Sequence, residues 1–259
     1  ASVENQQELI LGNVIGSNIA NLFLILGITG LIYPLIVQSS TIWKEIPLSL
    51  LAVALLFLLS NNFFFGSVLE LSRIDGLVLI LMFTLFVYYV FRQLKTDTST
   101  IEIPAKKMAK WKTWLFIVIG LAGLVIGGRL VVNNAVEIAT VLGVSEKIIG
   151  FTIVAIGTSL PELATSVVAA LKKNTNIAVG NIIGSNIFNI FLIISISSLV
   201  RPVEFNPVFN TDLYILAGGT AFLFIAMFTG EKKKLDRWEA SILLLFYLLY
   251  IGFLVFNEI

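Results

Sequence analysis

Charged residues divide the chain into long apolar stretches, and these stretches predict its secondary structure. A helix needs about 20 mostly apolar residues to cross the hydrocarbon core of a bilayer. The stretches of that character lie at residues 9–43, 46–69, 74–91, 113–135, 148–171, 174–200, 213–230 and 240–257. The charges inside them are Asp75, Arg129 and Glu162. We therefore expect an all-α protein with eight transmembrane helices joined by short connections, which excludes a closed β-barrel.

The composition supports a membrane protein and removes several other classes. Of the 259 residues, 58% are hydrophobic and 13% are charged, whereas a soluble domain carries about 25% charged residues. The net charge of +1 and the short basic tracts argue against a nucleic-acid partner. The absence of Cys and His excludes disulfide bonds, thiol catalysis and cysteine-based metal centres. We expect a polytopic protein in the lipid bilayer that is not an enzyme and holds no cofactor.

The distribution of Lys and Arg predicts the orientation of the helices. When the connections are taken alternately, one set carries 13 of these residues and the other carries 4. Cytoplasmic connections are the ones enriched in Lys and Arg. The richer set includes residues 94–112, so we expect this segment to be a cytoplasmic linker. Residue 1 would then lie outside, in a multi-pass protein of the cell membrane.

Two segments of the chain are copies of one another. Residues 11–35 align without gaps to residues 179–203, with 14 identities in 25 positions. The identities include Gly, Asn, Ser and Pro, which apolar composition alone would not match. The copies lie on the first and sixth predicted spans, so they cross the membrane in opposite directions. Inverted repeats with polar, glycine-broken helices in matching places are typical of secondary transporters with a midplane binding site.

The repeat divides the chain and also exposes an absence. We expect residues 1–93 to be the remainder of a first inverted repeat and residues 113–259 to form the second. Residues 150–166 precede the second copy, and the offset of 168 residues would place their counterpart before residue 1. We therefore expect that two N-terminal helices of the intact protein are missing here. Without them, the chain would leave its site open and would not transport alone.

One acidic residue is the strongest candidate for chemistry. Glu162 lies deep in an apolar span, where a charge costs at least a few kcal/mol and usually faces the interior of the bundle. Pro161 removes a backbone donor, and Gly157 lies shortly before it, so we expect a break in this helix. Hydroxyls, freed carbonyls and a carboxylate are the oxygen ligands that hard cations prefer. The alternative is a structural Glu162 that is paired with Arg129 or satisfied by hydroxyls.

The repeated segment carries a polar stripe on each copy. Its residues recur at intervals of four, which places them on one face of a helix. The stripes are Asn13, Ser17 and Asn21 in the first copy, and Asn181, Ser185 and Asn189 in the second. Pairs of glycines beside each stripe indicate close helix packing instead. We assign packing to the glycines and ion or water coordination to the stripes. The pair Gly123 and Gly127 has no stripe beside it and indicates packing alone.

These motifs resemble the sodium/calcium exchanger family of the cation/calcium antiporter superfamily. The resemblance rests on GTSLPE at 157–162, GNIIGSN at 180–186 and GNVIGSN at 12–18. It implies two inverted halves of five helices each, of which this chain would contain the last eight helices. The resemblance also implies the ligands of the transported ions, namely Thr158, Ser159, Glu162, the carbonyl of Ala155, Ser185, Asn189, Ser17 and Asn21.

Two features set this chain apart within the resemblance. Several exchangers have Asp in one half at the position of Asn21 or Asn189, and both are Asn here. The site therefore carries less negative charge, which bears on potassium dependence and on the number of sodium ions. The short linker has no room for the regulatory calcium-binding domains of animal exchangers, so a simple prokaryotic-type transporter is implied.

We expect a sodium/calcium antiporter that exports calcium against sodium influx by alternating access around Glu162. Sodium and calcium would be its substrates and not its cofactors. Proton/calcium exchange, or exchange of another cation, is the alternative within transport. A membrane fragment or subunit that does not transport is the second alternative. An intramembrane hydrolase is disfavoured because the chain has no His, no Cys and no pair of Asp residues within a span.

Overall fold

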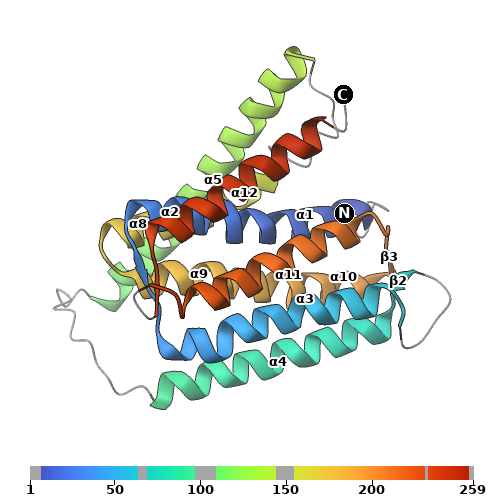
Figure 1. Cartoon of the computed structure of the whole chain (residues 1–259), viewed down its shortest axis with the longest axis horizontal. Coiled ribbons are helices and arrows are strands. Elements are labelled where there is room, and N and C mark those ends of the chain that lie inside the picture. Colours follow the sequence, from blue (N-terminus) through green and yellow to red (C-terminus); the bar gives the residue numbers. More distant parts are fainter. Residues whose placement is uncertain (1–6, 64–68, 97–108, 144–154, 231–232, 257–259) are drawn as a thin grey trace.

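The computed structural model describes residues 7–63, 69–96, 109–143, 155–230 and 233–256, and most of them are helical (Figure 1). The helices are α1 (Gln7–Ile19), α2 (Leu26–Ile32), α3 (Ile46–Ser60), α4 (Arg73–Thr96), α5 (Lys110–Val141), α7 (Ala155–Thr158), α8 (Leu160–Leu171), α9 (Thr175–Phe188), α10 (Ser195–Val200), α11 (Phe209–Ala226) and α12 (Arg237–Phe256). Three π-helical segments, Ala20–Ile25, Thr41–Glu45 and Asn189–Ile194, extend these helices.

The predicted membrane spans are largely confirmed. Seven stretches of helix in the described part of the chain are long and apolar enough to cross a bilayer. They are Ile10–Ile32, Thr41–Ser60, Arg73–Lys95, Lys110–Val141, Thr175–Val200, Phe209–Ala226 and Arg237–Phe256. The prediction at 148–171 lies partly outside the described residues, and from Ala155 onward it consists of α7 and α8. The chain is therefore an α-helical, multi-pass integral membrane protein.

Several helices begin earlier than the charge gaps predicted, because charged side chains cap them. Ser72 donates its backbone N–H and its hydroxyl to Asp75 Oδ2, at 2.8 and 2.6 Å, just before α4 begins. In the same way, the backbone N–H of Asp236 donates to Glu239 Oε2 at 2.7 Å before α12. Such capping boxes satisfy helix N–H groups that have no partner within the helix. A charge near the end of a span thus belongs to the helix and does not delimit it.

Two short β-ladders, which the sequence did not predict, join the halves of the chain. The strands are β1 (Leu35–Ile36), β2 (Glu70–Leu71), β3 (Val203–Glu204) and β4 (Lys234–Leu235). β1 pairs antiparallel with β4, and β2 pairs antiparallel with β3. Leu35 lies opposite Leu235, and its repeat counterpart Val203 lies opposite Leu71. Each half therefore contributes its first strand to the second strand of the other half, as a two-fold axis requires.

Helix packing follows the same symmetry. α2 packs against α12, and the corresponding pair is α10 against α4. A Cβ atom on Gly30 would lie 2.7 Å from Ala240 Cβ, and one on Gly76 would lie 2.6 Å from Ser198 Oγ. Figure 1 shows α1 and α2 running in the direction opposite to α9 and α10. The two copies of the repeat are thus inverted, as the sequence predicted.

The repeated helices occupy the centre of the molecule and α5 lies at its edge. The spans Ile10–Ile32 and Thr175–Val200 are the most buried of the seven. By contrast, α5 is exposed along most of its length and packs against α7 and α8. The glycines of the repeated motif do not break their helices, contrary to our expectation, since a glycine costs a helix only about 1 kcal/mol. The irregularity comes later, at the π-helical segments Ala20–Ile25 and Asn189–Ile194, and such segments are frequent at functional sites.

Candidate functional site

The helix that carries Glu162 is broken where the sequence predicted. α7 ends at Thr158, and Ser159 has φ −96° and ψ 4°, which is not a helical conformation. α8 then starts at Leu160 with Pro161 in its first turn, where a missing backbone N–H does no harm. Ser159 is buried, and its carbonyl accepts the first hydrogen bond of α8, from the N–H of Leu163 at 3.0 Å. The break therefore places Glu162 in the first turn of a new helix.

Glu162 faces α9, and one of its oxygens has no protein partner. The hydroxyl of Ser185 donates to Glu162 Oε1 over a long 3.5 Å. Glu162 Oε2 is buried and, among the described residues, has no hydrogen-bond partner. No ion pair joins Glu162 to Arg129 in the described part of the chain, so the structural pairing considered above is not found. A buried, unpaired carboxylate oxygen is costly in an apolar medium unless a ligand satisfies it.

The polar stripe of the first copy reaches the broken helix from the other side. Ser17 Oγ and Thr158 Oγ1 lie 2.9 Å apart. The Thr158 hydroxyl also donates to Asn13 Oδ1 at 3.1 Å. On the second copy, Asn181 Nδ2 donates to the carbonyl of Glu162 at 3.4 Å and to Ser166 Oγ at 3.1 Å. Both stripes therefore contact the segment from Thr158 to Ser166, as a site shared by the two copies requires.

Deeper in the bundle, the two stripes are joined by amides. Asn21 Nδ2 donates to Asn186 Oδ1 at 3.0 Å, and Asn189 Nδ2 donates to Asn18 Oδ1 at 2.9 Å. Asn18 and Asn186 also donate to each other's backbone carbonyl, at 3.2 and 3.3 Å. Sequence reasoning did not select Asn18 and Asn186, although both follow the serine of the motif at the same offset. Their identity in the two copies was the signal that could have identified them.

Six of the eight predicted site residues make direct polar contacts, and these contacts form three separate sets. Ser17 contacts Thr158, Ser185 contacts Glu162, and Asn21 and Asn189 join the amide network. Ser159 is buried at the helix break and Ala155 is the first residue of α7. Among the hydrogen bonds of the described residues, none ties the Ser159 hydroxyl or Ala155 to the other six.

The packing role assigned to the glycines is wrong for part of the chain. A Cβ atom on Gly180 or Gly184 would meet nothing within 4 Å in the described part of the structure. The same holds for Gly123 and Gly127 on α5. Because α5 lies at the edge of the described structure, these two glycines have no close neighbour among the described residues. Beside Ser185, the missing Cβ of Gly184 leaves open space next to the polar stripe.

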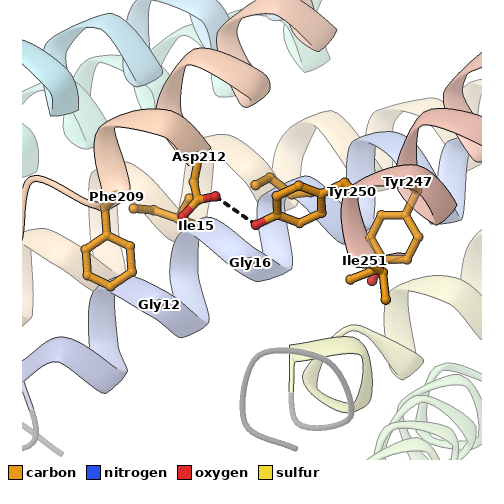
Figure 2. A pocket seen from close by; sticks show the side chains of 9 residues that line it. Gly12, Ile15, Gly16, Phe209, Asp212, Tyr247, Tyr250 and Ile251 are labelled. Carbon is orange, nitrogen blue, oxygen red and sulfur yellow. Dashed lines mark hydrogen bonds between the residues drawn. The ribbon is translucent and has the colours of Figure 1, made fainter. Parts of the chain in front are cut away.

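A second polar feature lies on another face of α1. Figure 2 shows a small pocket lined by Gly12, Ile15, Gly16, Ile19, Phe209, Asp212, Tyr247, Tyr250 and Ile251. The hydroxyl of Tyr250 donates to Asp212 Oδ1 at 2.8 Å. Asp212 was placed outside the predicted span, but α11 begins at Phe209, so Asp212 belongs to its first turn. A carboxylate is favoured at the N-terminus of a helix, and none of the eight predicted site residues lines this pocket.

The donor set around Glu162 is suited to a hard cation. No three Asp, Glu, His or Cys side chains gather into a metal-binding group within the described residues. The polar groups at this segment are one carboxylate, together with hydroxyl and amide groups from both copies of the repeat. Two inverted repeats that surround a set of oxygen ligands are typical of multi-pass secondary transporters of cations.

Comparisons with known proteins agree with this class and make it more specific. The family model described as sodium/calcium exchanger protein matches residues 1–92 and 112–256. The chain therefore belongs to the sodium/calcium exchanger family, and its class of activity is cation and calcium antiport. Members of this family are transporters and not enzymes.

Individual relatives cover most of the chain. It is 35% identical over 267 residues to the putative antiporter CaxA of Alkalimonas amylolytica, covering 100% of this chain and 82% of the relative. It is 29% identical to the sodium/calcium exchanger MaX1 of Methanosarcina acetivorans, covering 97% of this chain and 81% of the relative. A solved structure of the sodium-calcium exchanger NCX_Mj superposes with a TM-score of 0.77 at 33% identity, covering 97% of this chain and 79% of that structure.

Proposed function

We propose that this protein exchanges calcium for sodium, exporting calcium as sodium enters the cell. The ion site consists of Glu162, Thr158, Ser159, the carbonyl of Ala155, Ser185, Asn189, Ser17 and Asn21. The observation that carries the proposal is the buried Glu162 Oε2, which has no partner among the described residues. The Ser185 hydroxyl of one copy contacts the same carboxylate, and Ser17 of the other copy contacts Thr158 at the nearby helix break. Relatives named as sodium/calcium exchangers support the choice of ions.

The chemistry of the site explains why calcium and sodium are suitable substrates. Both are hard cations that prefer oxygen ligands. A divalent ion loses much hydration free energy on entering the bundle, and the charge of Glu162 offsets part of that loss. Hydroxyls and amide carbonyls then complete the shell without adding charge. Sodium carries a single charge and loses less hydration free energy, so the same carboxylate can offset its loss as well. The two ions can therefore compete for the same ligands.

The inverted repeats provide the means of alternating access. We propose that residues 1–93 belong to one half, residues 113–259 to the other and residues 94–112 to a linker. The excess of Lys and Arg in alternate connections supports a cytoplasmic linker. The bacterial and archaeal sources of the relatives support a prokaryotic cell membrane. Exposing a site between two inverted halves to one side and then to the other requires only that the halves rock or slide past each other.

The test is calcium flux into proteoliposomes that contain the full-length protein, driven by an imposed sodium gradient. Glu162→Gln keeps the shape of the side chain and removes its charge, so calcium flux should be abolished. Glu137→Gln is the matched control, because Glu137 is exposed on α5 and should tolerate the same change. Calcium flux retained by Glu162→Gln would show that the carboxylate is structural. Flux that follows a pH gradient and ignores sodium would identify a proton/calcium exchanger instead.

A further inference from the structure

Asn18 and Asn186 form a symmetric pair at the contact between α1 and α9. The exposed fraction is 0% for Asn18 and 1% for Asn186. Each side-chain Nδ2 donates to the backbone carbonyl of the other residue, at 3.2 and 3.3 Å. Because residue 186 is the repeat counterpart of residue 18, the pseudo-two-fold axis passes between them. No charged group is needed to hold the halves together at this point.

The two backbone carbonyls determine the orientation of both side chains. A carbonyl oxygen only accepts hydrogen bonds, so the amide atom that faces it has to be nitrogen. If Asn18 were flipped, its Oδ1 would face the carbonyl oxygen of Asn186, and two acceptors would repel each other. Oδ1 of each residue must therefore point the other way. Asn18 Oδ1 accepts a hydrogen bond from Asn189 Nδ2, and Asn186 Oδ1 accepts one from Asn21 Nδ2.

The orientation is passed on to the second pair of amides. Asn18 Oδ1 faces Asn189 at 2.9 Å, and Asn186 Oδ1 faces Asn21 at 3.0 Å. Since both are acceptors, Asn21 and Asn189 must turn their NH2 groups toward them. The carbonyl oxygens of Asn21 and Asn189 then point away from the axis pair. Asn21 Oδ1 is buried and has no hydrogen-bond partner among the described residues.

We propose that Asn18 and Asn186 are positioning residues that make Asn21 and Asn189 present oxygen, and not NH2, to the transported cation. The proposal rests on the ion site proposed above and adds the reason why its amides face the correct way. A free amide in the same place could flip and offer N–H groups, which repel a cation. Two main-chain carbonyls thus determine the orientation of four side-chain amides. The arrangement also explains why amides suit positions 21 and 189 here. A carboxylate at position 21 would place an acceptor against the acceptor Asn186 Oδ1, and one at position 189 would do the same against Asn18 Oδ1.

The experiment compares three variants of the full-length protein in proteoliposomes. Asn186→Leu removes both hydrogen bonds and frees the amide of Asn21. Its apparent KM for calcium should rise roughly tenfold while the maximal rate stays within about twofold, because lost ligand orientation weakens binding. Asn61→Leu is the matched control, since Asn61 and Asn210 also exchange reciprocal amide bonds between the halves, at 2.8 and 3.0 Å. It should keep the KM of the wild-type protein.

Asn186→Asp gives a readout that a structural tether would not. When protonated, the new side chain can donate O–H to the Asn18 carbonyl and accept from Asn21, as the native amide does. When ionised it has no donor. The calcium KM of this variant should therefore match the wild-type value at acidic pH and exceed it as pH rises, relative to the wild-type profile.

The outcomes separate this proposal from the function it rests on. A wild-type KM in Asn186→Leu, or an equal rise in Asn61→Leu, would overturn the positioning role. If the wild-type protein shows no sodium-driven calcium flux, the proposed function fails, but positioning is still measured by the increase in melting temperature that calcium chloride produces. Asn186→Leu should need roughly tenfold more calcium chloride than the wild-type protein for the same increase, whereas Asn61→Leu should need no more. An unchanged calcium dependence in Asn186→Leu would contradict the proposal.

Discussion

Ser17 and Thr158 lie 141 positions apart, yet their hydroxyl oxygens are 2.9 Å from each other. The first belongs to the central helix of one repeat copy and the second to the helix break of the other half. Ser17 lies in the last turn of α1, and Thr158 is the last residue of α7. Contact between the halves at this point thus brings together two oxygen donors that suit a cation.

The first prediction concerns this pair. Ser17→Ala removes one donor of the proposed site, while the Thr158 hydroxyl keeps its hydrogen bond to Asn13 Oδ1. A typical hydrogen bond contributes about 0.5–1.5 kcal/mol, so the apparent KM for calcium should rise about twofold to tenfold. The measurement is calcium flux into proteoliposomes over a range of calcium concentrations.

Ser241→Ala is the control for Ser17→Ala. The Ser241 hydroxyl is exposed and donates to the carbonyl of Arg237 in its own helix at 2.7 Å. Its loss should leave both KM and the melting temperature unchanged. An unchanged KM in Ser17→Ala, with a lowered melting temperature, would assign Ser17 to packing between the halves and remove it from the ion site.

The second prediction concerns the contact between α5 and α7. A Cβ atom on Gly157 would collide with the Cγ2 methyl of Val132, a branched side chain that cannot turn away freely. Gly157→Ala should therefore destabilise the protein by about 1–3 kcal/mol, which a lower melting temperature in detergent would reveal. Loss of calcium flux should accompany it, because α7 ends in the proposed ligand Thr158.

A second change should restore what Gly157→Ala removes. Val132→Ala deletes the colliding methyl groups, so the double variant should recover most of the melting temperature. Gly123→Ala on α5 is the control. A Cβ atom there would meet nothing within 4 Å among the described residues, so this variant should be neutral or slightly stabilising. If Val132→Ala fails to rescue Gly157→Ala, glycine is required for the backbone conformation at the break between α7 and α8. Close packing of α5 against α7 would then not be the reason for it.

The spans and the inverted relation of the repeats could be predicted from the sequence because both depend on patterns within the chain. A stretch such as 174–200 contains no charge, and its membrane helix follows from length and hydropathy. The break at Ser159 could be anticipated from Gly157 and Pro161. The two copies lie on the first and sixth predicted spans, and this odd spacing was sufficient to predict that they run in opposite directions.

Other features depend on contacts between distant segments and could not be predicted in this way. The ladder of Leu35 with Leu235 needs two residues from each strand, too short a signal beside the surrounding apolar helices. Asn18 and Asn186 matter because of the carbonyls that they face across the axis, and no local spacing encodes that contact. Asp212 was misplaced because it lies inside the first turn of α11, whereas the gap between charged residues placed the start of the span after it.

The last prediction tests the exchange of strands between the halves. Leu35 and Leu235 are paired directly across an antiparallel ladder, and so are Leu71 and Val203. Facing residues in such ladders have Cα atoms about 4.5–5.5 Å apart, which suits a disulfide bond, since these span Cα distances of about 4.4–6.8 Å. The chain has no cysteine of its own. Leu35→Cys with Leu235→Cys, and Leu71→Cys with Val203→Cys, should therefore cross-link under mild oxidation.

Cleavage at a protease site inserted between residues 97 and 108 gives the measurement. In the paired variants, the two halves should migrate together on a non-reducing gel and separate after reduction. The mismatched variant, Leu35→Cys with Val203→Cys, is the control: these are counterparts in the repeat, but they belong to different ladders, so its halves should separate without reduction. Efficient cross-linking of the mismatched pair would place the first strands of the two halves side by side. That result would contradict the two-fold, inverted arrangement on which the shared ion site depends.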